Sequence, residues 1–213
     1  MQVWSIVELS LYVTGVAVLT SSLIGIPLGL WLGLSHFRAK WFLSATINTG
    51  MALPPVVVGL LLYLVLSRSG PLAVLDWLFT SQAMILAQIV LTLPFVVGIT
   101  MSSVEAIPRE LADQVKSLGA SDWQCRWSVL REARQGVLLS VAAAFGRSIS
   151  EVGAVLMVGG NIQGHTRVLT TAIVLETGKG NFELALMLGF LLLSMALLVN
   201  VLILRLRGGV LFA

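Results

Sequence analysis

The chain has 213 residues, of which 57% are hydrophobic and 11% charged, with a formal net charge of +3 and a mean hydropathy of +0.97. Soluble domains are roughly 45 to 50% apolar and about 25% charged, so this composition excludes an ordinary soluble protein and predicts an integral membrane protein. The polar stretches are too short to bury a core of their own. We therefore expect an all-α chain in which residues 1–213 form a single membrane domain.

Five apolar stretches are long enough to cross the bilayer as helices, which takes about 20 residues for about 30 Å of hydrocarbon. We expect these spans at Leu9–Leu34, Trp41–Leu66, Ala83–Val104, Val137–Val158 and Leu184–Leu204. Interior prolines predict kinks, which membrane bundles tolerate when neighbouring groups satisfy the freed carbonyls. These prolines are Pro27, the Pro54-Pro55 pair and Pro94. The apolar stretch 168–175 is too short for a sixth span, so we interpret it as an external or re-entrant segment.

The basic residues of the connections are unequally divided between the two sides. One set of connections holds nine of them: Arg38, Lys40, Arg109, Lys116, Arg126, Arg131, Arg134, Arg205 and Arg207. The opposite set holds only Arg68, Arg167 and Lys179. By the positive-inside rule the first set is cytoplasmic. We therefore expect the amino terminus outside, the carboxyl terminus and residues 105–136 in the cytoplasm, and residues 159–183 as an external loop.

The predicted cytoplasmic connection carries local signals for two short helices. Pro108 suits the first helical position, and Gly119 supplies a left-handed stop for the first helix. Ser121, followed three residues later by Gln124, forms a capping box that opens the second helix. Apolar side chains recur at helical spacing in each helix. They are Leu111, Val115 and Leu118 in the first helix, and Trp123, Trp127 and Leu130 in the second.

Three interpretations of this helical pair compete. It could be a connector packed under the bundle, a DNA-reading helix-turn-helix, or a docking surface for a soluble partner. Residues 105–136 contain five basic and five acidic side chains, whereas nucleic-acid modules carry a basic face that neutralises phosphates. We therefore expect no nucleic-acid partner and favour the docking surface.

The run 113–121 (DQVKSLGAS), continuing to Trp123 and Val129, resembles the EAA loop of permease subunits of ATP-binding-cassette (ABC) importers. In that loop an acidic residue and two small residues precede an invariant glycine, which corresponds here to Gly119. This chain differs from the family pattern, with Gln114-Val115 in place of two alanines and Arg131-Glu132 in place of Leu-Pro. Its place between the third and fourth predicted spans matches that of the EAA loop.

Other segments extend the resemblance over most of the chain. Residues 54–60 (PPVVVGL) and 145–154 (FGRSISEVGA) resemble signatures of the second and fourth spans of molybdate, tungstate and sulfate permeases. Residues 159–162 (GGNI) and 165–173 (HTRVLTTAI) are most similar to tungstate-type permeases. The chain is thus identified as a permease subunit of an ABC importer, with tungstate as the first substrate and molybdate or sulfate as alternatives.

The resemblance implies a type I ABC-importer transmembrane domain in the cell (inner) membrane of a prokaryote. It implies two copies of the chain around a shared pathway, two cytoplasmic ATPase subunits and an extracellular oxyanion-binding protein, all working by alternating access. The sequence lacks the Gly-x4-Gly-Lys-Ser/Thr phosphate loop, so we expect ATP hydrolysis in a separate chain and no enzyme activity here. The implied ATPase-coupling residues are Asp113, Val115, Leu118, Gly119, Ala120, Trp123 and Trp127.

Two charges, Arg147 and Glu151, fall inside the fourth predicted span, where an isolated charge costs at least about 2.5 to 3.5 kcal/mol. Four residues apart, they share a helix face and can pair. The pair either holds helices together or helps to set a gate facing the pathway. Residues 159–183 are either a solvated loop or, from the resemblance, part of the external gate or the binding-protein contact. The candidate pathway or gate residues are Arg147, Ser150, Glu151, Asn161, Thr170 and Thr171.

Two further function classes remain as alternatives. In an ion-coupled secondary transporter, Arg147 and Glu151 would form a proton-coupled pair, but such proteins show internal repeats and the five spans show no convincing repeat. An intramembrane hydrolase needs a nucleophile with a base or paired metal ligands. The sequence lacks Gly-x-Ser-x-Gly and His-Glu-x-x-His and has only two histidines, His36 and His165. We expect no metal site and no cofactor.

Overall fold

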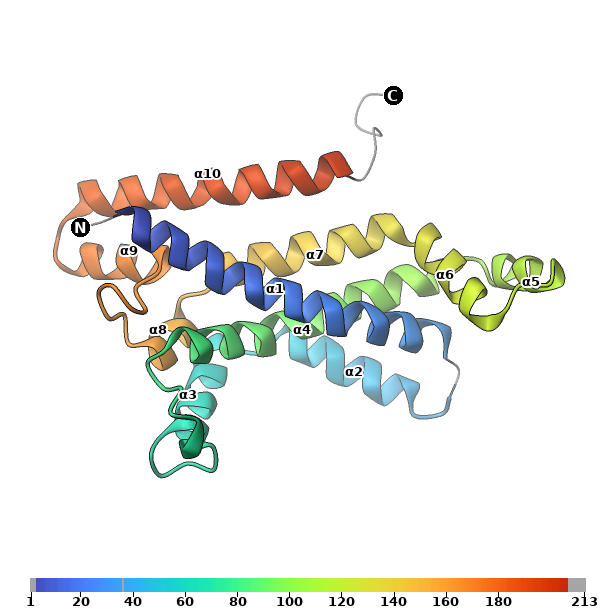
Figure 1. Cartoon of the computed structure of the whole chain (residues 1–213), viewed down its shortest axis with the longest axis horizontal. Coiled ribbons are helices and arrows are strands. Elements are labelled where there is room, and N and C mark those ends of the chain that lie inside the picture. Colours follow the sequence, from blue (N-terminus) through green and yellow to red (C-terminus); the bar gives the residue numbers. More distant parts are fainter. Residues whose placement is uncertain (1–2, 36, 207–213) are drawn as a thin grey trace.

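The computed structural model describes residues 3–35 and 37–206, and within these ranges it is helical without strands (Figure 1). His36 and Arg207, which the sequence analysis considered, lie outside the described residues. In chain order the elements are α1 (Val3–Leu34), α2 (Lys40–Met51), α3 (Pro55–Leu66), the 3-10 turn η1 (Ala73–Leu75), α4 (Ser81–Glu105), α5 (Arg109–Ser117), α6 (Asp122–Glu132), α7 (Arg134–Ile149), α8 (Gly153–Gly159), α9 (Leu169–Gly178) and α10 (Phe182–Leu206).

Three of the described helices, α1, α4 and α10, are long and apolar enough to cross a membrane, and two bent helix pairs bring the number of candidate spans to five. The pairs are α2 with α3, bent by 95°, and α7 with α8, bent by 56°. The predicted spans Trp41–Leu66 and Val137–Val158 are therefore not single kinked helices. Pro55 is the first residue of α3 and follows the three non-helical residues 52–54 after α2, whereas Pro27 and Pro94 lie inside α1 and α4.

The closest helix pairing joins α1 to α4 through small residues at every fourth position of α1. A Cβ atom on Gly29 would lie only 2.7 Å from Cβ of Thr100 and 2.8 Å from the Val97 carbonyl oxygen. Gly25 and Gly33 meet Val96 and Val104 in the same way. Such small-residue ridges let membrane helices approach closely. The four-residue spacing of these glycines was a signal for helix pairing that the sequence analysis did not use.

The short apolar stretch after residue 168 forms α9, which is packed into the bundle. Leu169 and Ala172 are fully buried and belong to a cluster with Ile6, Val7 and Leu188 from α1 and α10. The backbone N–H of Leu169 donates to Ser10 Oγ on α1 at 2.8 Å. The solvated-loop interpretation of residues 159–183 is therefore wrong for α9, because its apolar face is covered by α1 and α10.

Candidate functional site

Helices α5 and α6 form a hairpin that extends beyond one end of the bundle (Figure 1). Gly119 follows α5 with φ +86°, its N–H donates to the Lys116 carbonyl at 2.9 Å, and the N–H of Ala120 donates to the Val115 carbonyl at 3.3 Å. These are the two hydrogen bonds of a Schellman motif. The capping box of Ser121 is also present. The predicted glycine stop and the second helix start are thus confirmed, while Pro108 precedes the first helical residue by one position.

An ion pair between Lys116 and Asp122, at 3.0 Å, closes the turn of the hairpin. The side-chain hydrogen bond from Lys116 lowers the pKa of Asp122, and the same bond raises the pKa of Lys116. Because the folded carboxyl has the lower pKa, its stabilising contribution is present above the unfolded pKa and is lost as the pH falls through the folded value. Both groups are exposed, so solvent screens the pair.

The two faces of the hairpin differ. Val129 is buried against Val104 and Ala133, which attaches the hairpin to the bundle. Leu118 and the two tryptophans of α6 are exposed, and the Trp123 side chain is 71% exposed. Large apolar side chains that the chain itself does not cover typically mark a contact surface. The tryptophans of the apolar stripe predicted for α6 therefore point outward, and it is Val129 that packs against the bundle.

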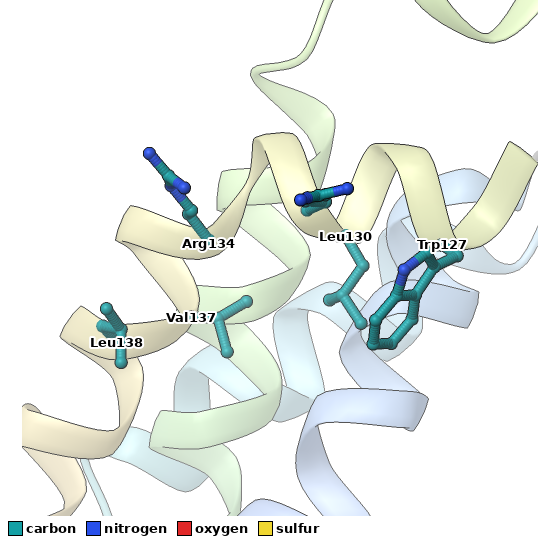
Figure 2. A pocket seen from close by; sticks show the side chains of 6 residues that line it. Trp127, Leu130, Arg134, Val137 and Leu138 are labelled. Atoms are coloured by element: carbon teal, nitrogen blue, oxygen red, sulfur yellow. The ribbon is translucent and has the colours of Figure 1, made fainter. Parts of the chain in front are cut away.

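The other predicted coupling residues also lie on this hairpin. Asp113 and Gly119 are exposed, whereas Val115 and Ala120 are half-buried. A cavity of about 550 Å³ lies where α6 joins α7, with Trp127 in its wall (Figure 2). The hairpin thus presents an exposed apolar edge at its tip and a cavity at its base.

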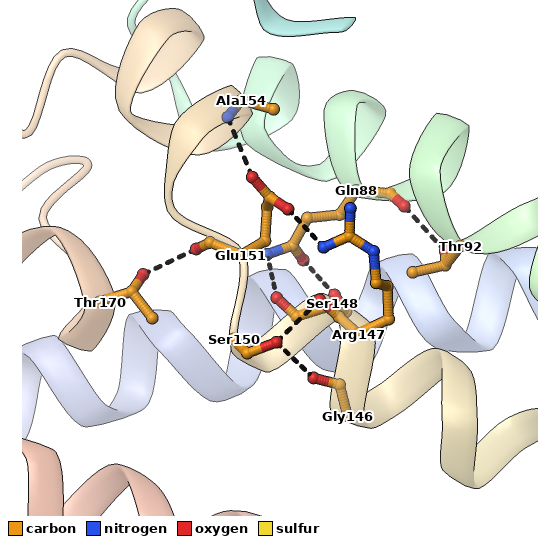
Figure 3. A network of polar contacts seen from close by, with 9 residues as sticks. All are labelled: Gln88, Thr92, Gly146, Arg147, Ser148, Ser150, Glu151, Ala154 and Thr170. Carbon is orange, nitrogen blue, oxygen red and sulfur yellow. Dashed lines mark hydrogen bonds and ion pairs between the residues drawn. The ribbon is translucent and has the colours of Figure 1, made fainter. Parts of the chain in front are cut away.

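A polar network surrounds the break between α7 and α8 (Figure 3). Arg147 and Glu151 form an ion pair with Nη1 and Oε2 2.8 Å apart. The second carboxylate oxygen of Glu151 accepts from the Ala154 N–H at 3.1 Å, and Thr170 Oγ1 donates to the Glu151 carbonyl at 2.8 Å. The Glu151 side chain is 2% exposed, whereas the Arg147 side chain is 24% exposed. The charged pair therefore joins α7, α8 and α9, with its cationic end partly open.

Gln88 on α4 is a member of this region that the sequence analysis missed. Its Nε2 donates to the Ser148 carbonyl at 3.1 Å, and Ser148 Oγ donates to its Oε1 at 2.7 Å. The Gln88 carbonyl accepts from Thr92 Oγ1, which also lies 2.7 Å from Ser21 Oγ of α1. An amide side chain inside a predicted apolar span, with a threonine one turn later, was the signal that the sequence offered. These bonds join α4 to the last turn of α7.

The remaining candidate gate residues fall into two places. Ser150 is exposed at the break and donates to the Gly146 carbonyl at 2.8 Å. Asn161 and Thr171 lie together at the start of α9, where the Asn161 amide donates to the Thr171 carbonyl at 3.4 Å. Thr171 Oγ1 also accepts from the Val168 N–H at 3.1 Å. Arg147, Ser150, Glu151 and Thr170 are thus brought together, while Asn161 and Thr171 shape the entry to α9.

Residues 25–210 match the family model described as "Binding-protein-dependent transport system inner membrane component". The chain belongs to this family. This assignment confirms the resemblance to ABC-importer permeases, and it makes the chain a multi-pass membrane component of an ABC importer.

Curated relatives of this permease cover between 80% and 97% of its length. A probable anion ABC transporter permease protein of Haloferax volcanii is 46% identical over 208 residues, covering 95% of this chain and 90% of the relative. The tungstate uptake system permease protein TupB of Peptoclostridium acidaminophilum is 39% identical over 206 residues, covering 97% and 90%. The molybdenum transport system permease protein ModB of Escherichia coli is 32% identical over 178 residues, covering 80% and 78%. The permease is therefore similar to transporters of anions.

Proposed function

We propose that the chain forms the translocation pathway of an ATP-driven importer of tungstate, with molybdate or sulfate as alternative oxyanions of the same class. Two relatives named as tungstate uptake permeases, at 39% and 37% identity, support tungstate. The proposed assembly holds two copies of this chain, two cytoplasmic ATPase subunits and an extracellular oxyanion-binding protein, in the cell membrane of a prokaryote. ATP hydrolysis then occurs in the ATPase partners.

The observation that carries this proposal is the exposed apolar edge of the α5–α6 hairpin. Leu118 and Trp123 offer an ATPase subunit a compact anchor at the tip of the hairpin, and aromatic anchors of this kind dominate binding energy at protein interfaces. Only Ala133 separates α6 from α7, so a displaced hairpin moves α7 directly. Closure of the ATPase dimer is thereby transmitted to the break that holds Arg147 and Glu151.

In this proposal, the break between α7 and α8 and the polar side chains around it act as part of the gate. Arg147 and Ser150 are the members of the cluster with exposed surface, so they line the pathway. The buried carboxylate of Glu151 would repel an oxyanion, so the cluster is not an anion-binding site. Thr170, Thr171 and Asn161 connect the gate to α9 and its preceding loop, which we place on the outer side near the binding protein.

The docking role is tested by co-purification with the ATPase subunit. We expect Trp123→Ala and Gly119→Arg to abolish co-purification, because the first removes the anchor and the second adds bulk and strain at a left-handed turn. Trp4→Ala is the matched control, since Trp4 is also 71% exposed but lies at the far end of α1. The permease itself should remain in the membrane in all three variants. Unchanged association in Trp123→Ala and Gly119→Arg would contradict docking at this edge.

The substrate and the energy source are tested by uptake in cells that express the permease with its ATPase and binding protein. We expect tungstate uptake to stop when ATP is depleted while the membrane potential is maintained. Excess molybdate or sulfate is then added separately, and the degree to which each inhibits tungstate uptake ranks the three anions. Uptake that persists without ATP but collapses with the ion gradient would instead support the ion-coupled secondary transporter.

A further inference from the structure

The cavity at the base of the hairpin has a mixed chemical character. Its volume of about 550 Å³ lies within the usual range for small-molecule sites, roughly 300 to 1,000 Å³. Its lining residues come from the end of α6 and the start of α7: Trp127, Leu130, Arg131, Arg134, Val137 and Leu138. Figure 2 shows Trp127, Leu130 and Val137 as a row of apolar side chains, while the Arg134 guanidinium points away from them. One part of the site is thus hydrocarbon and the other cationic.

The two arginines lack an anionic partner. Among the described residues, neither Arg131 nor Arg134 forms an ion pair with an acidic side chain. Arg131 lies in the last turn of α6 and Arg134 is the first residue of α7, so both basic side chains lie at the joint between the two helices. Two unpaired guanidinium groups therefore border an apolar cavity, and both favour a negatively charged ligand.

The position of the cavity in the fold identifies the kind of ligand. Helix α6 belongs to the polar hairpin, whereas α7 begins a bent pair that is apolar enough to cross the membrane. The cavity therefore lies where the chain enters the bilayer, at the depth at which tryptophan and arginine side chains meet lipid headgroups. A ligand at this depth that has both hydrocarbon and a negative charge is a membrane lipid.

We propose that this cavity binds one anionic phospholipid, with an acyl chain against Leu130, Val137 and Leu138 and the phosphate between Arg131 and Arg134. The inference rests on the proposed insertion of α7 into the membrane, but not on ATPase docking or on the transported anion. Bound there, the lipid headgroup neutralises the charge at the joint between hairpin and span. It also fills the cavity beside the segment that the ATPase is proposed to move.

The test uses the purified full-length chain in lipid nanodiscs and the fluorescence of Trp127. Brominated lipid quenches a tryptophan that it touches, and Trp127→Phe identifies the part of the signal that belongs to this residue. We expect brominated phosphatidylglycerol to quench Trp127 at a lower mole fraction than brominated phosphatidylcholine does. Soluble glycerol 3-phosphate at millimolar concentration should not relieve the quenching, because it lacks the acyl chain. Equal quenching by both lipids, or relief by glycerol 3-phosphate, would overturn the proposal.

Variants that remove positive charge inside or outside the cavity test the arginines. Each basic side chain near an anionic headgroup contributes about fivefold to binding, so the preference for phosphatidylglycerol should weaken about fivefold in Arg131→Gln and about 25-fold in Arg131→Gln/Arg134→Gln. Arg126→Gln removes one charge from the same helix outside the cavity and should leave the preference unchanged. If Arg126→Gln weakened the preference as much as Arg131→Gln alone, the effect would be one of general surface charge, and the proposed site would be wrong.

Co-purification with the ATPase separates this inference from the proposed function. We expect the Arg131→Gln/Arg134→Gln variant to retain its ATPase partner while it loses lipid selectivity. If the ATPase dissociates and the lipid preference remains, the arginines contact the ATPase and the lipid site is wrong. Failure of Trp123→Ala to affect ATPase binding would contradict the docking edge but leave the lipid measurement intact.

Discussion

At the scale of single residues, Glu151 is a carboxylate buried at the break between α7 and α8, with its side chain only 2% exposed. A buried charge is tolerated only when it is paired and hydrogen-bonded. Glu151 meets both conditions through Arg147 and the Ala154 N–H. The sequence spacing of four residues was sufficient to predict the pair. It was not sufficient to choose between a pair that only holds helices together and a pair that forms part of a gate.

A double mutant separates these two roles. Glu151→Gln leaves Arg147 without its counter-ion, which we expect to cost about 1 to 3 kcal/mol of stability, less than the 3 to 5 typical of a fully buried pair because Arg147 is partly exposed. Adding Arg147→Gln removes the unpaired charge and should restore thermal stability in detergent. If the pair is part of the gate, uptake stays low in the stable double variant.

The control for this pair is Ser150→Ala at the neighbouring exposed position, which should retain wild-type thermal stability. Normal uptake by the double variant would make the pair structural only. Normal stability of Glu151→Gln would contradict the packing argument itself.

At the scale of elements, the structure is organised around α4, which contacts α1 along the small-residue ridge and α7 through Gln88. The span boundaries predicted from apolar runs identify the right stretches of chain. They do not predict that two of the stretches are broken. Mean hydropathy is averaged over a window of residues and carries no information about a change in the direction of the helix axis. The break before Pro55 had a local signal in the proline pair, whereas the one around Glu151 depends on contacts with α9.

The ridge between α1 and α4 leads to a paired glycine test. Gly29→Ala places a Cβ atom 2.8 Å from a backbone carbonyl oxygen, which cannot move aside cheaply, so we expect a loss of about 1 to 3 kcal/mol. Gly15→Ala on the same helix meets nothing within 4 Å and should be neutral or stabilising by up to about 1 kcal/mol. Thermal unfolding of the purified variants measures both effects. A Gly29→Ala variant as stable as Gly15→Ala would show that the two helices are not in close contact.

At the scale of the whole molecule, the chain leaves large apolar surfaces uncovered. The helix α3 projects from the bundle and α10 lies along its edge (Figure 1). Exposed side chains on these two helices include Val56, Val57, Leu60, Leu61, Leu64, Leu186, Phe190, Leu193 and Leu197. Exposed apolar surfaces that run along whole helices are typically covered by lipid or by another chain. They fit the proposed assembly of two copies in a bilayer.

The proposed orientation is tested by labelling with a membrane-impermeant maleimide. In a Cys125→Ser background, which removes the chain's single cysteine, we expect Lys116→Cys to be labelled only after the cells are opened. Arg68→Cys in the opposite set of connections should be labelled in intact cells, because the larger number of basic residues marks the cytoplasmic side. Labelling of Lys116→Cys in intact cells would place the hairpin outside and contradict ATPase docking.

The sequence by itself determined the membrane class, the approximate position of the apolar spans and the form of the hairpin around Gly119 and Ser121. These features depend on composition, on spacing along one helix and on the chemistry of a single turn, all of which are local. The tertiary structure decided the geometry of the break at Glu151, the role of Gln88, the burial of α9 and the outward position of Trp123. Each of these depends on which distant segments meet, and a local pattern, such as the amide and threonine spacing at Gln88, does not identify the segment that will be the partner.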